Sequence, residues 1–157
     1  MARPRTRLLA IDPGKVRLGL AVSDPDRRLA SPLTTYARRD LEQDLRFLVK
    51  IIEEHDIAQV VIGLPVHLSG REGEQAKAAR AFGALVARRT GLPCVFWDER
   101  FTTREAEAAL WTAGLTHKQR KARRDQVAAQ LLLRDYLEAG CPADQTIAPL
   151  ETDPKEP

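Results

Sequence analysis

The chain has 157 residues, of which 43% are hydrophobic and 30% are charged, and its formal net charge is +3. This length suits one ordinary domain with a real core, and the composition excludes a wholly disordered chain. The first apolar run spans only Leu8 to Ile11, too short for a signal peptide or a membrane span, so we expect a cytoplasmic protein without membrane contact. Cys94 and Cys141 lack metal-ligand spacing, and Cys94 is expected to be a small core residue.

The first part of the chain predicts strands followed by a helix. Residues 7–12 form an apolar run that stops at Pro13, as expected of a buried strand. Residues 18–23 and 29–36 follow after short connections, which favour antiparallel neighbours. A helix over residues 40–55 is predicted by a stripe at helical spacing that consists of Leu41, Leu45, Leu48 and Ile52.

Strands and helices alternate in the second part. The β-branched run 59–64 predicts a strand, the Ala-rich run 72–89 a helix, and 94–97 the last strand. Thr102 and Glu105 form a capping box that predicts a further helix ending at Gly114. A final helix is predicted over 124–138.

This order of elements predicts an α/β fold. Three antiparallel strands followed by strand–helix–strand units give a mixed five-stranded sheet, with two parallel strands at its end, flanked by helices. We expect a single domain over residues 1–140 and a disordered, Pro-rich tail over 141–157.

Acidic residues stand at apolar positions in three places. Asp12 ends the first apolar run, Asp98 and Glu99 end the run 94–97, and Asp125 lies within the final helix. Desolvating a carboxylate is costly unless it is paired or binds a cation. Because ligands gather at the carboxyl ends of parallel strands, the acids predict an anionic pocket that holds a divalent metal.

The geometry of each acid constrains that pocket. Asp98 and Glu99 cannot both face one site if the strand continues through them, because adjacent strand residues point to opposite faces. Asp125 shares the helix face of Ala128, Ala129, Leu132 and Tyr136, which should face the sheet. The opposite, solvent-facing side is predicted to carry Arg123, Gln126, Gln130 and Arg134.

Each acid also has an ordinary structural explanation. Asp12 before Pro13-Gly14 can initiate a turn, Asp98 can cap a helix or pair with Arg100, and Asp125 can favour a helix amino end. Asp125 within the apolar stripe is the hardest to explain in that way. The three positions together favour a metal site.

Several stretches, taken together, resemble the YqgF/RuvX family. They are residues 10–24, Gly63-Leu64-Pro65 with Gly70 and Gly73, residues 97–103, and residues 121–129. Members of this family are described as Holliday-junction resolvases and as nucleases for the 5′ end of 16S ribosomal RNA precursors. The resemblance implies an RNase H-like fold and cleavage of phosphodiester bonds that depends on Mg²⁺ or Mn²⁺.

Carried over by position, the family's acidic residues fall on Asp12, Glu99 and Asp125, with Asp98 adjacent as an alternative metal ligand. These three are the expected catalytic residues. The expected nucleic-acid contacts are polar or basic and comprise Lys15, Arg17, Arg100, Thr102, Thr103, Lys118, Arg120, Lys121, Arg123 and Arg124. A solvated basic loop is the competing explanation for the cations between Lys118 and Arg124.

The expected function is therefore a metal-dependent nuclease acting on structured nucleic acid, with 5′-end processing of the 16S ribosomal RNA precursor preferred. A Holliday-junction resolvase is the alternative, and it requires a homodimer because a junction needs paired symmetric cuts. A non-catalytic nucleic-acid-binding module ranks third, since carboxylates facing phosphates do not help binding. An actin-like ATPase ranks last, because 157 residues leave no second half to enclose a nucleotide.

Overall fold

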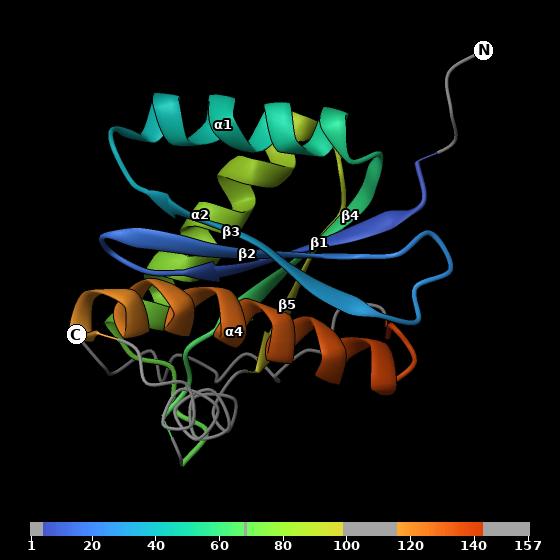
Figure 1. Ribbon diagram of the computed structural model, residues 1–157. Helices are drawn as coiled ribbons and strands as arrows, with labels where there is room; N and C mark the ends of the chain where they lie inside the picture. Colours follow the sequence, from blue (N-terminus) through green and yellow to red (C-terminus); the bar gives the residue numbers. More distant parts are fainter. Residues whose placement is uncertain (1–4, 68, 99–115, 143–157) are drawn as a thin grey trace.

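The computed structural model describes residues 5–67, 69–98 and 116–142 (Figure 1). Within the final helix, the backbone is described throughout, but the side chains at 117, 120–123, 125 and 126 are not. The helix predicted to start near Thr102 and residues 143–157 of the predicted tail lie outside these residues.

Within the described residues, five strands and three helices follow one another in the predicted order. The strands are β1 (Arg7–Pro13), β2 (Arg17–Ser23), β3 (Ala30–Ala37), β4 (Ile57–Leu64) and β5 (Cys94–Asp98). The helices are α1 (Leu41–Glu54), α2 (Glu74–Thr90) and α4 (His117–Glu138). The strand boundaries differ from the expected ones by at most two residues.

The strands form one mixed sheet in the order β3-β2-β1-β4-β5. Strand β2 runs antiparallel to β1 and to β3, while β4 runs parallel to β1 and to β5. The predicted α/β class, with three antiparallel strands followed by two parallel ones, is therefore confirmed. Strand β1, which ends in Asp12 and Pro13, lies at the centre of the sheet.

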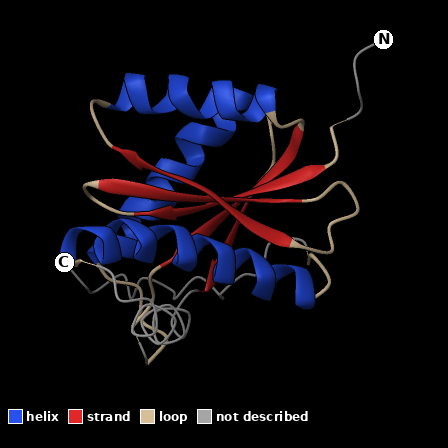
Figure 2. Cartoon of the chain, viewed as in Figure 1, coloured by secondary structure: helices blue, strands red, loops and turns tan. Residues whose placement is uncertain are grey.

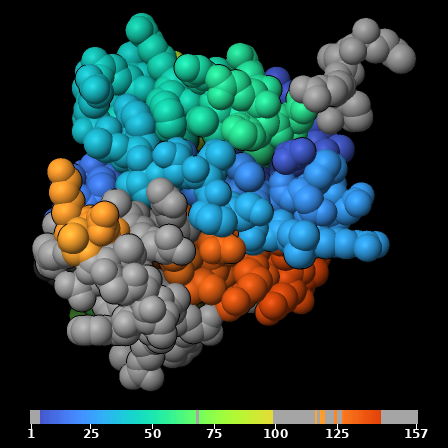
Figure 3. Space-filling view, viewed as in Figure 1, coloured from blue at the N-terminus to red at the C-terminus, as the bar shows by residue number. Residues whose placement is uncertain are grey.

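Helices cover both faces of the sheet and create two cores (Figure 2). Side chains of β1 alternate between them, as the pleat requires. Leu9 and Ile11 belong to the core beneath α1 and α2, whereas Leu8 and Ala10 belong to the core beneath α4. Figure 3 shows the edge strand β3 between α1 and α4. On this strand Ser31 and Pro32 are exposed. Proline lacks an N–H group, so Pro32 weakens this edge as a template for further strands.

Helix α4 begins at His117, well before the predicted residue 124. A capping box explains the difference: the Thr116 hydroxyl accepts from the Gln119 backbone N–H at 3.2 Å, and the Gln119 side chain accepts from the Thr116 N–H at 3.0 Å. The basic run from Lys118 to Arg124 is therefore helical, and the interpretation as a basic loop is wrong.

The carboxyl-terminal half of α4 is anchored by Tyr136, which is fully buried. Its hydroxyl accepts from Gln59 Nε2 at 2.9 Å and donates to the Pro142 carbonyl at 2.6 Å, and its ring meets Trp97 edge-on at 5.3 Å. Gln130, expected on the solvent side, instead donates to the Ala30 carbonyl of β3 at 3.1 Å. Among the described residues, no helix combines the length and apolar character that crossing a bilayer requires.

Candidate functional site

The carboxyl ends of β1, β4 and β5 meet at one edge of the sheet because the three strands are parallel. Ile11 pairs with Ile62, and one and two residues further along β4, Gly63 pairs with Trp97 and Leu64 with Asp98. Asp12, half-buried, follows Ile11 directly. Asp12 and Asp98 therefore lie at the same edge of the sheet, one residue apart in register, as the sequence predicted.

Asp12 and Asp98 nevertheless belong to opposite faces of the sheet. Asp12 alternates with Ala10 and so lies on the α4 face. Asp98 alternates with Phe96, which packs against the core beneath α1 and α2, while Trp97 packs on Tyr136 of α4. This parity separates Asp98 from Asp12. Glu99 lies outside the described residues.

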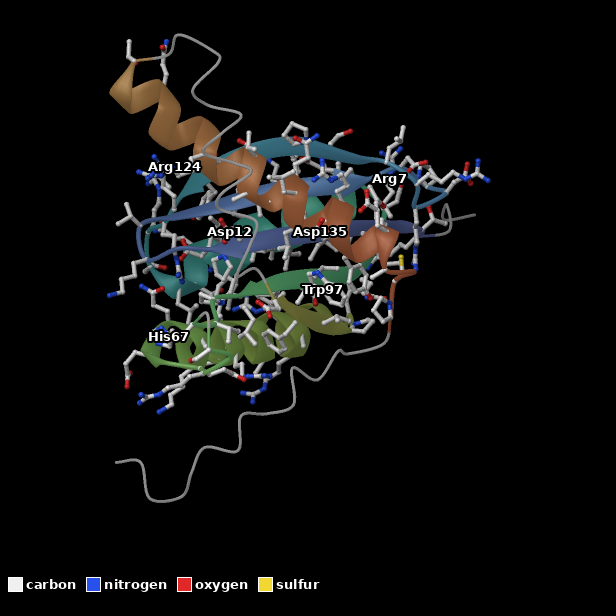
Figure 4. All side chains as sticks on the ribbon, turned by 90° about the horizontal axis from the view of Figure 1, so that it is seen from below. Arg7, Asp12, His67, Trp97, Arg124 and Asp135 are labelled. Atoms are coloured by element: carbon white, nitrogen blue, oxygen red, sulfur yellow. The ribbon has the colours of Figure 1, made fainter. Side chains whose placement is uncertain are left out.

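Position 125 approaches the same edge from α4. Ala129 and Leu132 of the helix pack in the core against the sheet, and position 125 lies on that side of the helix, about one turn before Ala129. Figure 4 shows Arg124 and Asp12 toward one end of the molecule and Arg7 toward the other. The amino-terminal half of α4 therefore shares an end of the molecule with the carboxyl end of β1.

The predicted metal ligands are only partly described. No three His, Cys, Asp or Glu residues within the described part of the chain form a group that could hold a metal ion. Glu99 and the side chain of Asp125 are outside that part. Asp12 is a half-buried carboxylate at a strand end, and carboxylate oxygens are the ligands that Mg²⁺ and Mn²⁺ prefer. Of the three expected catalytic ligands, Asp12 is thus the one whose side chain is described, and its chemistry fits such an ion.

Cations occur on the β1–β2 hairpin, which follows Asp12 in the sequence, and on α4, which covers the same face of the sheet. Lys15 is exposed at the tip of the β1–β2 hairpin and Arg17 is half-exposed, while Lys118 and Arg124 are exposed on α4. The other predicted contacts cannot be placed as side chains: Arg100, Thr102 and Thr103 are outside the described residues, and only the backbone is described at Arg120, Lys121 and Arg123.

The hairpin that carries Lys15 is held by Arg38, a residue that the sequence analysis missed. The Arg38 backbone N–H donates to the Val16 carbonyl at 2.8 Å, and its Nη1 donates to the Gly14 carbonyl at 3.0 Å. Its guanidinium carbon lies 4.9 Å from the centre of the Phe82 ring. Arg38 follows β3 in the sequence, and no local pattern there indicates these contacts.

Asp44 of α1 fixes Arg38 in turn. Its carboxylate accepts from Arg38 Nε at 3.0 Å and from the Arg39 backbone N–H at 2.9 Å, and its side chain is only 1% exposed. Burial alone would raise the pKa of Asp44, but hydrogen bonds from Arg39, Arg38 and Tyr36 outweigh burial and lower it. Asp44 is therefore a charged anchor beneath the hairpin.

In the part of the chain that the structure describes, two pockets lie on the α2 side of this edge. The larger, of about 380 Å³, is lined by Pro13, Gly14, Lys15, Arg38 and the first turns of α2. The smaller, of about 290 Å³, is lined by the β4–α2 loop, including His67 (Figure 4). Both share Glu74 and Gln75, so together they border the amino end of α2.

Comparison with known proteins gives consistent matches. A family model described as "RuvX: Holliday junction resolvase" matches residues 6–139. A Rhodopirellula baltica protein named "Putative pre-16S rRNA nuclease" is 43% identical over 133 residues, 85% of this chain and 77% of that protein. A Lachnospira eligens protein of the same name is 39% identical over 136 residues, 85% and 97% of the two chains.

A solved structure supports the fold. Thermus thermophilus RuvC in complex with a Holliday-junction substrate matches with a TM-score of 0.54 at 16% identity, over 86% of this chain and 96% of that one. A likeness at this identity shows a shared RNase H-like fold.

Proposed function

The chain belongs to the RuvX family, and we propose that it is a divalent-metal-dependent nuclease that hydrolyses phosphodiester bonds in structured nucleic acid. The observation that carries this proposal is Asp12 at the carboxyl end of the central strand, on the same face as α4. Relatives about 40% identical bear a pre-16S rRNA nuclease name, which favours processing of the 5′ end of that precursor.

In this proposal Asp12, Glu99 and Asp125 hold one or two Mg²⁺ or Mn²⁺ ions. The chemistry such an ion supplies when bound is Lewis-acid activation of water and stabilisation of the charge that develops on the phosphate. Three carboxylates alone would repel a phosphate, so the cation is what makes their placement compatible with a nucleic-acid substrate.

The basic residues have a separate role. Lys15 and Arg17 lie on the hairpin that follows Asp12, and Lys118 and Arg124 lie on α4, which covers the same face of the sheet as Asp12; in this proposal they hold the phosphates next to the cut. Such contacts carry no sequence information, so they suit either an RNA or a branched DNA backbone.

Resolution of Holliday junctions is the second candidate function. The description of the matching family model favours it. A junction resolvase must make two symmetric cuts, and that requires two copies of Asp12 in a homodimer. Trimming of RNA makes no such demand, so the substrate and the oligomeric state are linked.

The first experiment compares cleavage of a single-stranded RNA that spans a 16S precursor 5′ end with cleavage of a synthetic four-way junction. Wild type and Asp12→Asn are assayed with Mg²⁺, Mn²⁺ or a chelator. We expect metal-dependent RNA cleavage that falls by about 100-fold or more in the variant, because a group that stabilises developing charge is lost. An unchanged melting temperature of the variant is the control for folding. Paired symmetric nicks in the junction alone would favour the second candidate, and full activity of the variant would contradict the role of Asp12.

A matched pair of variants tests the neighbouring acids. Strand parity places Asp98 on the face opposite Asp12, so we expect Asp98→Asn to keep most of the cleavage activity and Glu99→Gln to lose it. Both substitutions remove one charge from adjacent residues, so each serves as the control for the other. The reverse result would assign the metal to Asp98.

A further inference from the structure

The larger pocket lies across the sheet from the face of Asp12. Pro13 and Gly14, the two residues that follow Asp12, form part of its wall, and Phe82 of the core beneath α1 and α2 forms another part. The pocket is therefore one or two residues of backbone away from Asp12, but on the α2 side of the sheet. No step of the proposed cleavage reaction uses it.

The walls of the pocket combine apolar surface with a few polar groups. Pro13, Ala78, Ala79 and Phe82 provide the apolar part. Glu74 and Gln75, both exposed in the first turn of α2, provide a carboxylate and an amide. Sites that bind small organic groups commonly have this composition and a volume of roughly 300–1,000 Å³.

Arg38 gives the pocket a fixed planar group. Its guanidinium packs against Phe82 and donates to Asp44 and to the Gly14 carbonyl. Those two hydrogen bonds use two of the five N–H groups of an arginine side chain. Because it is already ordered by these contacts, the guanidinium loses little conformational entropy when a ligand meets it.

The chemistry of the walls selects among ligands. A free phosphate is disfavoured by the Glu74 carboxylate and by the apolar wall around Phe82. A purely apolar group would form no hydrogen bond or ion pair with the side chains of Glu74, Gln75 and Lys15. A neutral, planar group can pack its face against the apolar side chains and form hydrogen bonds with the polar ones through donors and acceptors on its edge. A nucleobase is such a group.

We propose that this pocket receives an unpaired nucleobase of the substrate strand, next to the phosphate that is cut. The proposal rests on the proposed nuclease function. The base stacks beside Arg38 and the apolar wall, its edge meets Glu74 and Gln75, and exposed Lys15 contacts the adjoining phosphate. Cleavage then requires a nucleotide that is unpaired beside the cut, as in single-stranded RNA or at the branch point of a junction.

A pocket-filling variant tests this site. Ala78 is exposed and lines the pocket, so Ala78→Phe fills it without disturbing the core; Ala84 is also exposed on α2 but does not line the pocket, so Ala84→Phe is the matched control. Amide chemical shifts are followed by NMR during titration with adenosine, uridine and inorganic phosphate. We expect the nucleosides to shift amides of Gly14, Lys15 and Gln75 in wild type and the control, but not in Ala78→Phe.

A second measurement uses the affinities of single-stranded and fully paired RNA. We expect Ala78→Phe to weaken single-strand binding about fivefold or more, the effect of losing one stacked base, and to leave duplex binding unchanged. Shifts with phosphate alone, or equal behaviour of Ala78→Phe and Ala84→Phe, would overturn the proposal. Nucleoside binding needs no catalysis, so a chain that binds nucleosides here but cleaves nothing would contradict the nuclease function and keep this site.

Discussion

Asp44 is a buried acidic residue whose contacts explain why it remains charged. It lies on the buried side of α1 and yet remains charged, because Arg38, Arg39 and Tyr36 supply hydrogen bonds to its carboxylate. The same contacts affect Tyr36, whose pKa is raised by burial and by the hydrogen bond to Asp44. A buried carboxylate with a full set of donors fixes the geometry of the groups around it.

We expect Asp44→Asn to destabilise the protein by about 2–3 kcal/mol at pH 7, because Arg38 loses its buried partner. The folded-state pKa of Asp44 lies below its unfolded value, so this contribution is present above about pH 4 and is lost as the pH falls through the folded pKa. Urea unfolding at pH 7 and at pH 3 measures the free energy of unfolding of wild type and variant. The difference between the two proteins should be smaller at pH 3 than at pH 7; an equal difference at both pH values would contradict the charged state of Asp44.

Asp44 also shows why the sequence could not identify every functional residue. It lies beside Leu41, Leu45 and Leu48 in the stripe that predicted α1, just as Asp125 lies in the stripe of α4. Leu41 itself is 42% exposed, whereas Asp44 is buried. An acidic residue in an apolar stripe indicates that it has a partner, but not whether that partner is a metal ion or another side chain. The partners of Asp44 are residues that precede α1, and with Arg38 it forms a structural ion pair.

At the scale of elements, the β1–β2 hairpin has the tightest backbone requirement. The Gly14 N–H donates to the Arg17 carbonyl at 3.0 Å, and a Cβ atom on Gly14 would lie 2.5 Å from the same oxygen. A backbone oxygen cannot move aside as a side chain can. Any other residue at position 14 must therefore open the turn that presents Lys15 and Arg17.

We expect Gly14→Ala to lower the free energy of unfolding by about 1–3 kcal/mol, because the clash is with backbone. Nucleic-acid binding should weaken as well, since the hairpin cations move. The control is Val16→Ala, which trims a side chain that is 67% exposed at the same tip and leaves the backbone unchanged. Denaturant unfolding and RNA affinity measure both effects, and wild-type values for Gly14→Ala would contradict the tight turn.

Boundaries were harder to predict than elements. The amino end of α4 was predicted too late because the run from Lys118 to Arg124 was interpreted by its charge, although Thr116 and Gln119 carry the spacing of a capping box. Charge says little about whether a segment is helical, because Lys and Arg are good helix formers. The reciprocal hydrogen bonds between the side chains and backbone N–H groups of Thr116 and Gln119 fix the boundary.

At the scale of the whole molecule, hydrophobic period and connection length were enough to predict the sheet. Short turns gave the antiparallel strands, and helical crossovers gave the parallel ones, so the carboxyl ends of β1 and β5 came to one edge. The sequence did not indicate which face of the sheet Asp12 and Asp98 lie on. That follows only from the observed alternation of buried side chains along β1 and β5. The pocket beside Arg38 could not be predicted, because its walls come from three separate segments of the chain: the β1–β2 hairpin, Arg38 and α2.

The central place of β1 has a consequence for how the chain folds. Its pairing with β2 closes a hairpin across three residues, whereas its pairing with β4 must wait until β2, β3 and α1 have been passed. Local contacts form quickly, and long loops delay the distant ones. In pulsed hydrogen exchange during refolding, we expect amides of β2 to become protected before those of β5, and simultaneous protection would contradict this order. The strand that carries Asp12 is thus where early local pairing and late long-range pairing join.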